Sequence, residues 1–356
     1  MHNRATTDET IALEAVPTCA LCGLPGQVLH TGLRDRLYAA PGEWQFLHCP
    51  RCTLIWESPR PLSADLGRLY STFYHYTHAP TYGPPGRFSA LQQFLEACVL
   101  GVAYGYTGLT PHIWQRVLGR VLALITPLRD AAGGRVMWLA AQQPMRVLDV
   151  GCGSGQLLAF LRDQGCEVSG IEPDLEAVRV ARQHYGLEVY HGLLEDGVFS
   201  DASFDAVVMS HVIEHVPDPI ALLAACRRML RPGGRVVVVT PNMASLGRRV
   251  LGTKWYLGWG PPWHLLLFDP TTIRAVATHA GLRVAAIHTS ARKARLGWTV
   301  NRLLKQHRSI PDFPAQHRSS WPLRLEAVLF QALETLAVAL WPVGEELVLV
   351  AQKEPA

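Results

Sequence analysis

The chain has 356 residues, of which 49% are hydrophobic, so it can form two or three folded units with apolar cores. Its net charge of +4 is only mildly basic, and it has no long Lys/Arg run, which argues against nucleic acid as a partner. The polar N-terminus lacks a signal-peptide pattern and no stretch is apolar enough to span a membrane. We therefore expect a cytoplasmic protein whose eight cysteines are thiols or metal ligands.

Two C-x-x-C pairs come first in the chain. Cys19 and Cys22 form one pair, and Cys49 and Cys52 form the other after 26 intervening residues. Four thiolates in two such pairs can surround Zn²⁺ tetrahedrally, whereas a redox-active C-x-x-C usually stands alone in a βαβ setting. We predict a zinc-ribbon-like module over residues 15–60 with a closed, structural metal site. A redox dithiol is the alternative.

Helical patterns fill the next segment, a linker or cap over residues 61–130. Tyr70, Tyr74 and Tyr76 belong to an aromatic helix that either packs on the next domain or lines an acceptor pocket. Residues 88–126 are apolar and helical in pattern, with interrupting glycines. They predict a helical cap over the active site, or alternatively an interfacial segment that contacts lipid.

After a turn expected at residues 130–134, strands and helices alternate to the C-terminus. The expected strands are residues 145–150, 167–172, 188–191, 204–209, 235–240, 283–288 and 346–352. The helices between them start near residues 156, 174, 219 and 270. This alternation predicts an α/β fold with a Rossmann-like seven-stranded sheet, which we delimit as a domain over residues 131–356.

A glycine turn, Gly151-Cys-Gly-Ser-Gly155, follows the first of these strands and precedes a helix. Glycine permits a tight turn and lets a ligand approach bare backbone, and the helix N-terminus supplies free N–H groups. A dinucleotide fingerprint needs glycine where Gln156 stands, which counts against an NAD(P) enzyme. Asp149 precedes the turn, and Glu172 ends the second strand about 20 residues on, where an acid can accept both ribose hydroxyls of a nucleoside.

Residues 243–268 follow the fifth strand and contain three tryptophans and His264. A long aromatic loop at the carboxyl edge of the sheet predicts a substrate lid. Residues 291–319 are rich in Arg, His and Pro and are expected to form a loose insertion. Residues 323–341 predict an amphipathic helix with a polar side. That side carries Arg324, Gln331, Glu334 and Thr335.

From residue 145 to 352 the order of motifs resembles the class I S-adenosylmethionine (SAM)-dependent methyltransferases, particularly the ubiquinone-type O-methyltransferase branch. After the glycine turn, the most specific matches are His211-Val-Ile-Glu-His-Val-Pro-Asp-Pro219 and Leu230-Arg-Pro-Gly-Gly234. The whole chain is similar to a bacterial subgroup that joins a four-cysteine zinc module to this domain. In that subgroup the lid typically reads Pro-Pro-Arg-His-Leu, whereas this chain has Trp263 at the arginine position. We hypothesise that its acceptor is less charged or more apolar.

The resemblance implies SAM as the cofactor, and an antiparallel last strand. Backbone N–H groups would bind the carboxylate of SAM, Asp149 would bind its ammonium group and Glu172 would bind its ribose. In the loop at residues 192–196, Leu193 or Leu194 can sandwich the adenine and Glu195 can accept a hydrogen bond from its exocyclic amine. An ordinary polar turn is the alternative. The full set expected around SAM is Asp149, Gly151, Cys152, Gly153, Gly155, Glu172, Pro173, Leu194, Glu195 and His211.

A hydroxyl acceptor must lose a proton, and histidine is the natural base near neutral pH. His264 in the lid is the first candidate. His215 is the second, with a structural hydrogen-bonding role as its alternative. In the ubiquinone branch the pair corresponding to Glu214 and His215 is associated with a divalent metal, so a metal at the acceptor is a further alternative.

We expect methyl transfer to a small-molecule, lipid-linked or saccharide-linked acceptor, at a hydroxyl group. O-, N- and C-methyltransferases share these motifs, so the acceptor atom stays open. A non-catalytic SAM-fold binding module and an NAD(P)-dependent oxidoreductase are the alternatives. Peripheral membrane contact by the helices at residues 88–126 and 323–341 also stays open, as does the oligomeric state.

Overall fold

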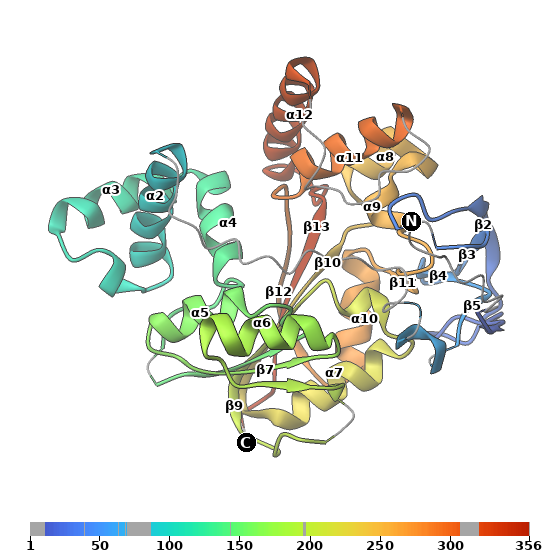
Figure 1. Ribbon diagram of the computed structural model, residues 1–356, viewed down its shortest axis with the longest axis horizontal. Helices are drawn as coiled ribbons and strands as arrows, with labels where there is room; N and C mark the ends of the chain where they lie inside the picture. Colours follow the sequence, from blue (N-terminus) through green and yellow to red (C-terminus); the bar gives the residue numbers. More distant parts are fainter. Residues whose placement is uncertain are drawn as a thin grey trace, which may run out of the picture.

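A seven-stranded sheet forms the centre of the fold (Figure 1). The computed structural model describes residues 11–38, 40–62, 64–67, 69, 87–142, 144–194, 197–306 and 320–355. In spatial order the strands are β12 (Arg283–Ser290), β13 (Glu346–Gln352), β10 (Leu230–Pro241), β9 (Phe204–Ser210), β6 (Arg146–Val150), β7 (Glu167–Glu172) and β8 (Val189–His191). β13 is antiparallel to both neighbours, and the strands from β10 to β8 are parallel. This confirms the predicted Rossmann-like sheet.

The central strands are buried on both faces. In β9, Val207 belongs to the core on one face and Val208 to the core on the other, because successive side chains of a strand alternate. The first face is covered by α7 (Pro219–Met229) and α10 (Pro270–His279). The second is covered by α4 (Thr126–Arg135) and α5 (Gln156–Asp163), and α6 (Leu175–Tyr185) packs beside α5.

Side-chain caps lie at the starts of the helices expected near residues 174 and 270. The Asp174 carboxylate caps α6 by accepting backbone N–H groups of Glu176 at 2.8 Å and Ala177 at 3.3 Å. Gly186 ends this helix in the left-handed conformation, with φ of 62°. Asp269 caps α10 in the same way. These caps fix where each helix meets the carboxyl edge of the sheet.

The N-terminal module and the lid share one antiparallel sheet. Its strands, in spatial order, are β11 (Leu266–Leu267) from the lid, then β4 (Ile55–Glu57), β3 (Trp44–His48) and β2 (Gln27–Leu33). Leu266 of β11 lies opposite Trp56 of β4. A two-stranded sheet of β1 (Leu13–Glu14) and β5 (Arg60–Pro61) lies beside it. The module therefore contacts the lid through backbone hydrogen bonds.

The lid and the segment after β12 contain helices of their own. The lid holds α8 (Leu246–Leu251), a short 3₁₀ turn η4 (Gly252–Lys254) and α9 (Tyr256–Trp259). Residues 294–306 form α11 (Ala294–Gln306), so the prediction of a loose insertion is wrong there. Val300, Leu303 and Leu304 recur at helical spacing and pack with Tyr256, which stabilises this helix.

The turn predicted at residues 130–134 is also wrong, because these residues lie within α4. Pro127 in the first turn starts this helix. Gly133 and Gly134, which suggest a turn in sequence, provide space instead. A Cβ at Gly133 would collide with Tyr104, and a Cβ at Gly134 would collide with Arg292.

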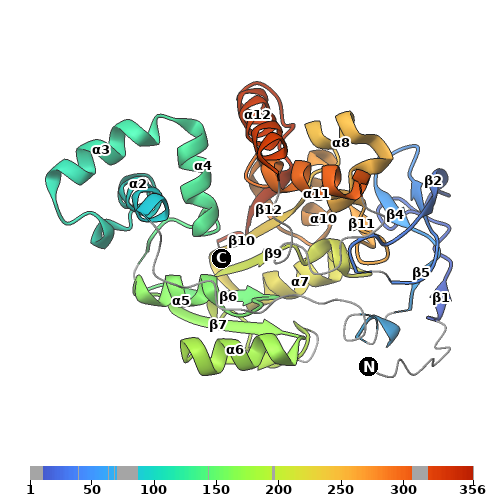
Figure 2. The ribbon, with the colours of Figure 1, turned by 45° about the horizontal axis from the view of Figure 1, so that its top comes forward.

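The helices α2 (Arg87–Ala103), η1 (Thr107–Leu109) and α3 (Ile113–Ala123) form an arm that projects from the sheet, with α4 at its base (Figures 1 and 2). The last helix, α12 (Trp321–Val338), rises beside it. Glu334 of α12 is buried and Leu329 is exposed, so the predicted polar side is not the solvent side. Tyr70, Tyr74 and Tyr76 lie outside the described residues. Among the residues that are described, no helix has the length and apolar character needed to cross a membrane.

Candidate functional site

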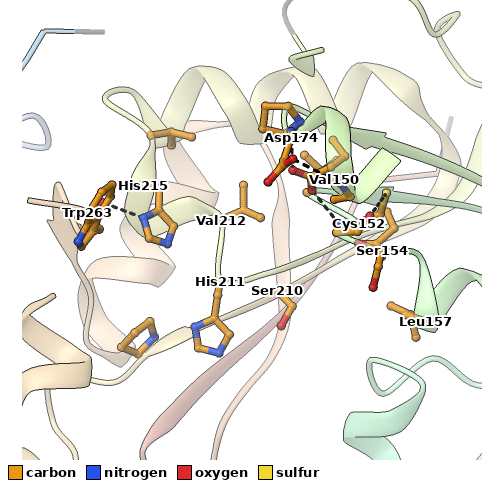
Figure 3. Close-up of a pocket in the computed structure, with 18 of the residues that line it drawn as sticks. Val150, Cys152, Ser154, Leu157, Asp174, Ser210, His211, Val212, His215 and Trp263 are labelled. Atoms are coloured by element: carbon orange, nitrogen blue, oxygen red, sulfur yellow. Dashed lines mark hydrogen bonds between the residues drawn. The ribbon is translucent and has the colours of Figure 1, made fainter. Parts of the chain in front are cut away.

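A cavity of about 1890 Å³ lies at the carboxyl ends of the parallel strands. Small-molecule sites typically measure about 300–1,000 Å³, so this cavity has room for two ligands. It adjoins β6 and β9, where the strand order reverses and such sheets bind ligands. Figure 3 shows Cys152 and Ser154 of the glycine turn on one side of the pocket, and His211, His215 and Trp263 on the other.

The glycine turn has the backbone that its sequence predicts. Gly151, Gly153 and Gly155 have φ of 70°, 54° and 80°. A Cβ at Gly151 would lie 2.5 Å from Val212 Cγ2, and a Cβ at Gly155 would lie 2.5 Å from Leu187 Cδ1. Nothing lies within 4 Å of the position of a Cβ at Gly153. The turn thus packs tightly behind and leaves bare backbone open toward the cavity.

Two acids flank this turn. Glu172 accepts the N–H of Gly153 at 2.8 Å and the N–H of Asp174 at 2.9 Å, which holds its carboxylate at the cavity. Asp149 is buried, and burial together with the nearby Glu172 charge raises its pKa well above the usual value. An ammonium group beside Asp149 would favour its ionised form. Bare backbone, a fixed carboxylate and a carboxyl that needs a cation fit SAM.

The other residues predicted around the cofactor have mixed outcomes. Cys152, Pro173 and Leu194 line the cavity, as does His211. Leu194 is buried, so it forms part of the wall. Glu195 lies outside the described residues.

His211 lies between two buried carboxylates. Its Nδ1 is 3.0 Å from Glu214 Oε1, and its Nε2 is 3.2 Å from Glu346 Oε1. Burial opposes the charged ring, but these hydrogen bonds outweigh burial and raise the pKa of His211 to about 9. Both ring nitrogens are therefore protonated near pH 7. An imidazolium of this kind fixes the turn after β9 and does not act as a base.

His215 and His264 meet edge to face, with ring centroids 4.9 Å apart. His215 Nδ1 lies 2.7 Å from the Trp263 carbonyl oxygen, and His264 Nδ1 lies 2.8 Å from that of Gly258. A carbonyl oxygen can only accept, so each Nδ1 donates and each Nε2 keeps a lone pair. Burial lowers the pKa of His264 to about 4 and also lowers that of His215. Both rings are neutral near pH 7.

Glu214, His215 and His264 also bear on the alternative of a divalent metal. Each offers one ligand atom, and these atoms lie within 4.8 Å of one another. The Glu214 carboxylate, however, already accepts hydrogen bonds from His211 on Oε1 and from the Thr240 hydroxyl on Oε2. A cation would share this carboxylate with a charged imidazolium. These residues therefore fit a metal poorly.

The four N-terminal cysteines form a compact cluster. Sγ atoms are separated by 3.3 Å in Cys19–Cys52 and in Cys22–Cys49, and by 3.9 Å in Cys22–Cys52. Zn–S bonds of about 2.3 Å in a tetrahedron place sulfurs about 3.8 Å apart. The N–H of Leu21 points to Cys19 Sγ at 3.4 Å, which would stabilise a thiolate. The cluster fits zinc.

Asp35 connects this module to the lid, a contact that sequence reasoning missed. Its buried carboxylate accepts three backbone N–H groups of residues 37–40, the hydroxyl of Tyr256 and the indole N–H of Trp263. The local turn around Asp35 has a sequence signal, because Asp commonly bonds backbone two residues on. No sequence pattern indicates that Tyr256 and Trp263 in the lid are its partners.

Glu346 was also missed, although a signal exists. An antiparallel last strand begins at the carboxyl edge of the sheet, and this one begins with Glu346, directly after Glu345. Glu345 accepts a hydrogen bond from the indole N–H of Trp255 in the lid at 2.7 Å. One of these two glutamates therefore contacts the lid, and the other contacts His211.

Residues 124–287 match the family described as "Methyltransferase domain". The chain is 34% identical over 175 residues to the ubiquinone biosynthesis O-methyltransferase of Xylella fastidiosa strain 9a5c, covering 44% of this chain and 70% of the relative. It is 32% identical over 200 residues to that of Thiobacillus denitrificans, covering 52% and 83%. Matches to two other Xylella fastidiosa strains span 61% of the relatives' length.

Solved structures are more distant. A SAM-dependent methyltransferase from Archaeoglobus fulgidus is 20% identical, with a TM-score of 0.43 over 64% of this chain and 93% of that one. A S-adenosylmethionine-dependent methyltransferase from Mesorhizobium loti is 16% identical, with a TM-score of 0.42 over 63% and 97%.

Proposed function

Because the chain belongs to the class I SAM-dependent methyltransferases, in the branch of the ubiquinone biosynthesis O-methyltransferases, we propose that it methylates a hydroxyl of an apolar, ring-containing acceptor. One observation carries this proposal. The glycine turn and Glu172 line one side of the same cavity that His264 lines on the other. A cofactor and an acceptor can therefore bind side by side.

SAM supplies an electrophilic methyl group on its sulfonium. The protein's contribution is to align the acceptor, exclude water and remove the hydroxyl proton. Alignment in a closed site contributes several kcal/mol, and a positioned base adds roughly 10²–10⁴-fold. His264 is the base in this proposal, because its Nε2 lone pair is available and its ring lines the cavity.

His215 positions that base. Its Nδ1–H donates to the backbone carbonyl of Trp263, the residue before His264. The backbone N–H of Leu265, the residue after His264, donates to the backbone carbonyl of Glu214 at 2.8 Å. The turn after β9 thus holds the lid on both sides of His264. The imidazolium of His211 stabilises that turn through Glu214.

The acceptor class follows from the walls of the cavity. Tyr38, Tyr256 and Trp263 line it on the lid side, and Tyr38 meets Trp263 edge to face at 5.6 Å between centroids. Aromatic walls favour a flat, weakly charged ring over an anionic group. The names of the relatives refer to ubiquinone biosynthesis, and a ring with a lipid tail is the acceptor that we favour over a saccharide-linked one.

The zinc ion in this proposal is structural. Four cysteine ligands would close its coordination sphere and leave no position for substrate. Cys19 and Cys49 share a buried core with Trp56 of β4 and with Leu266 of β11, the strand that the lid adds. The metal would therefore hold the lid by stabilising the sheet to which the lid is attached.

The test is methyl transfer with isotope-labelled SAM and paired acceptors. Each pair is a hydroxylated aromatic ring with an apolar tail and the same molecule with an amine in place of the hydroxyl. Label on the hydroxyl oxygen, located by mass spectrometry, supports the proposal. Label on nitrogen or ring carbon contradicts O-transfer. Cofactor binding without transfer to any acceptor supports the alternative of a non-catalytic binding module.

A further inference from the structure

One side of α3 is exposed and apolar. Ile113, Trp114, Val117, Val121 and Leu124 recur at helical spacing and are 52–83% exposed. Single exposed apolar residues are ordinary on protein surfaces, but a contiguous stripe along a helix marks an interaction surface.

The exposed side of α12 carries a second stripe. It consists of Leu325, Leu329, Leu333, Leu336 and Leu340, which are 45–72% exposed. The indoles of Trp321, at the start of the helix, and Trp341, just beyond its end, are exposed as well. The opposite side is buried, because Leu323 packs with Tyr256 and Phe330 stacks on Trp298.

The two helices that carry the stripes lie on the same side of the molecule. Both views show α3 and α12 rising on the same side, away from α6 and α7 (Figures 1 and 2). A cavity of about 440 Å³ is lined by α2 of the arm and α4 at its base on one side and by α12 on the other. The main cavity also reaches this region, because Arg135 of α4 and Leu296 of α11 line it.

The charges beside these stripes are positive. Between Glu96 and Asp130 the sequence contains Arg116, Arg120 and Arg129 and no acidic residue. Arg116 and Arg120 are exposed and border the apolar stripe of α3.

Of the two acidic residues on α12, one is buried and the other is half-exposed but ion-paired. Glu326 pairs with Arg302 at 2.8 Å, and Glu334 is buried. Arg324 near its start is exposed. The exposed arginines that border the two stripes thus complement an anionic partner.

We propose that the stripes of α3 and α12 dock on an anionic lipid surface. Apolar side chains of amphipathic helices enter the boundary between headgroups and acyl chains, tryptophans favour that boundary, and arginines contact the headgroup phosphates. This places the part of the main cavity that Arg135 and Leu296 line on the side that meets the lipid. The inference goes beyond the proposed methyl transfer and does not depend on it.

The test is co-sedimentation of the full chain with phosphatidylcholine vesicles, prepared with and without phosphatidylglycerol. The double variant Val117→Asp/Val121→Asp should weaken binding to anionic vesicles at least about tenfold, because two apolar side chains are lost and two negative charges added. Val28→Asp is the matched control. Val28 is 59% exposed on β2 of the N-terminal module, against 52% and 57% for Val117 and Val121.

A second variant separates charge from apolar contact. Arg116→Gln/Arg120→Gln should weaken binding to anionic vesicles by about fivefold per arginine and leave neutral vesicles unaffected. All variants should keep the melting temperature and the affinity for S-adenosylhomocysteine, which shows that the fold and the cofactor site are intact.

Three results would overturn the proposal. Wild-type protein that binds neither vesicle, or a Val117→Asp/Val121→Asp variant that binds anionic vesicles as tightly as wild type, excludes lipid docking by α3. The third result is a wild-type dimer, detected by light scattering, that dissociates in this variant. If the wild type then binds no vesicles, the stripe forms a contact between copies of the chain.

Discussion

Asp35 in the N-terminal module accepts a hydrogen bond from the indole Nε1 of Trp263 in the lid at 3.3 Å, across 228 residues of sequence. The same carboxylate accepts the hydroxyl of Tyr256. The N-terminal module therefore holds the lid wall of the cavity, while β6 and β7 contribute to the wall that carries the glycine turn.

Replacing Asp35 by Ala should affect the acceptor and not the cofactor. Each lost side-chain hydrogen bond costs about 1 kcal/mol, so we expect Asp35→Ala to raise the acceptor KM by about tenfold. Affinity for S-adenosylhomocysteine should stay within about twofold of wild type. Asp201→Ala, at an exposed position, is the control. An unchanged acceptor KM would show that the Asp35 contact does not hold the wall.

Zinc should be bound at one ion per chain and should stabilise the lid. Removal by a chelator should lower the melting temperature by at least about 5 °C, because the metal holds the sheet that β11 completes. Cys22→Ser should lose the metal, as measured by atomic absorption. Cys166→Ser, at a buried thiol outside the cluster, should retain it. Full metal content in Cys22→Ser would exclude this site.

Much of the sheet could be predicted because buried strands have continuous apolar runs, as in Val236–Val239 of β10. The glycine turn and Glu172 were predictable because they lie at strand ends, where ligand contacts gather. Gly133 and Gly134 led to the wrong prediction of a turn, because they lie inside a helix and leave space for Tyr104 and Arg292.

Contacts between residues that lie far apart in the sequence could not be predicted, because no local sequence pattern indicates them. The joint of Asp35 with the lid depends on a pairing between distant segments, and the burial of Glu334 depends on where α12 packs. The charge state of His211 was hidden for the same reason. One of its two carboxylates, Glu346, lies 135 residues away.

Cofactor binding should strengthen as pH rises. The pKa of Asp149 is raised well above its usual value by burial and by the charge of Glu172, so the protonated form dominates at lower pH. It must lose this proton to pair with an ammonium group, so binding is linked to proton release. Affinity for S-adenosylhomocysteine should rise by up to about tenfold per pH unit where Asp149 titrates.

Calorimetric titrations from acid to neutral pH would measure this rise. Asp149→Asn cannot ionise, so its affinity should be weaker and independent of pH in the same range. A wild-type affinity that is equally flat would show that Asp149 does not pair with the ammonium group.

His264 and His215 should differ in how they respond to substitution. His264→Ala should lower kcat by about 10²–10³-fold with cofactor affinity intact, and His264→Asn should not restore it. His215→Ala should also lower activity, but His215→Asn should recover most of it, because the amide can still donate to the Trp263 carbonyl.

The pH profile gives a second readout for His264. Burial lowers its pKa to about 4, so the ring stays deprotonated at neutral pH. The kcat should therefore stay level when pH falls from about 8 to about 5 and decline only below that. A decline centred near pH 6.5, or full turnover in His264→Ala, would assign the base elsewhere.

The most direct measurement is calorimetric titration with S-adenosylhomocysteine, and with NAD in parallel. We expect one S-adenosylhomocysteine per chain and no binding of NAD. Glu172→Ala should weaken binding at least about tenfold, because hydrogen bonds to a charged group contribute about 1.5–3 kcal/mol. Glu167→Ala, at the exposed opposite end of β7, should bind as wild type does. Binding of NAD without S-adenosylhomocysteine, or wild-type affinity in Glu172→Ala, would contradict the assignment of this cavity as the SAM site.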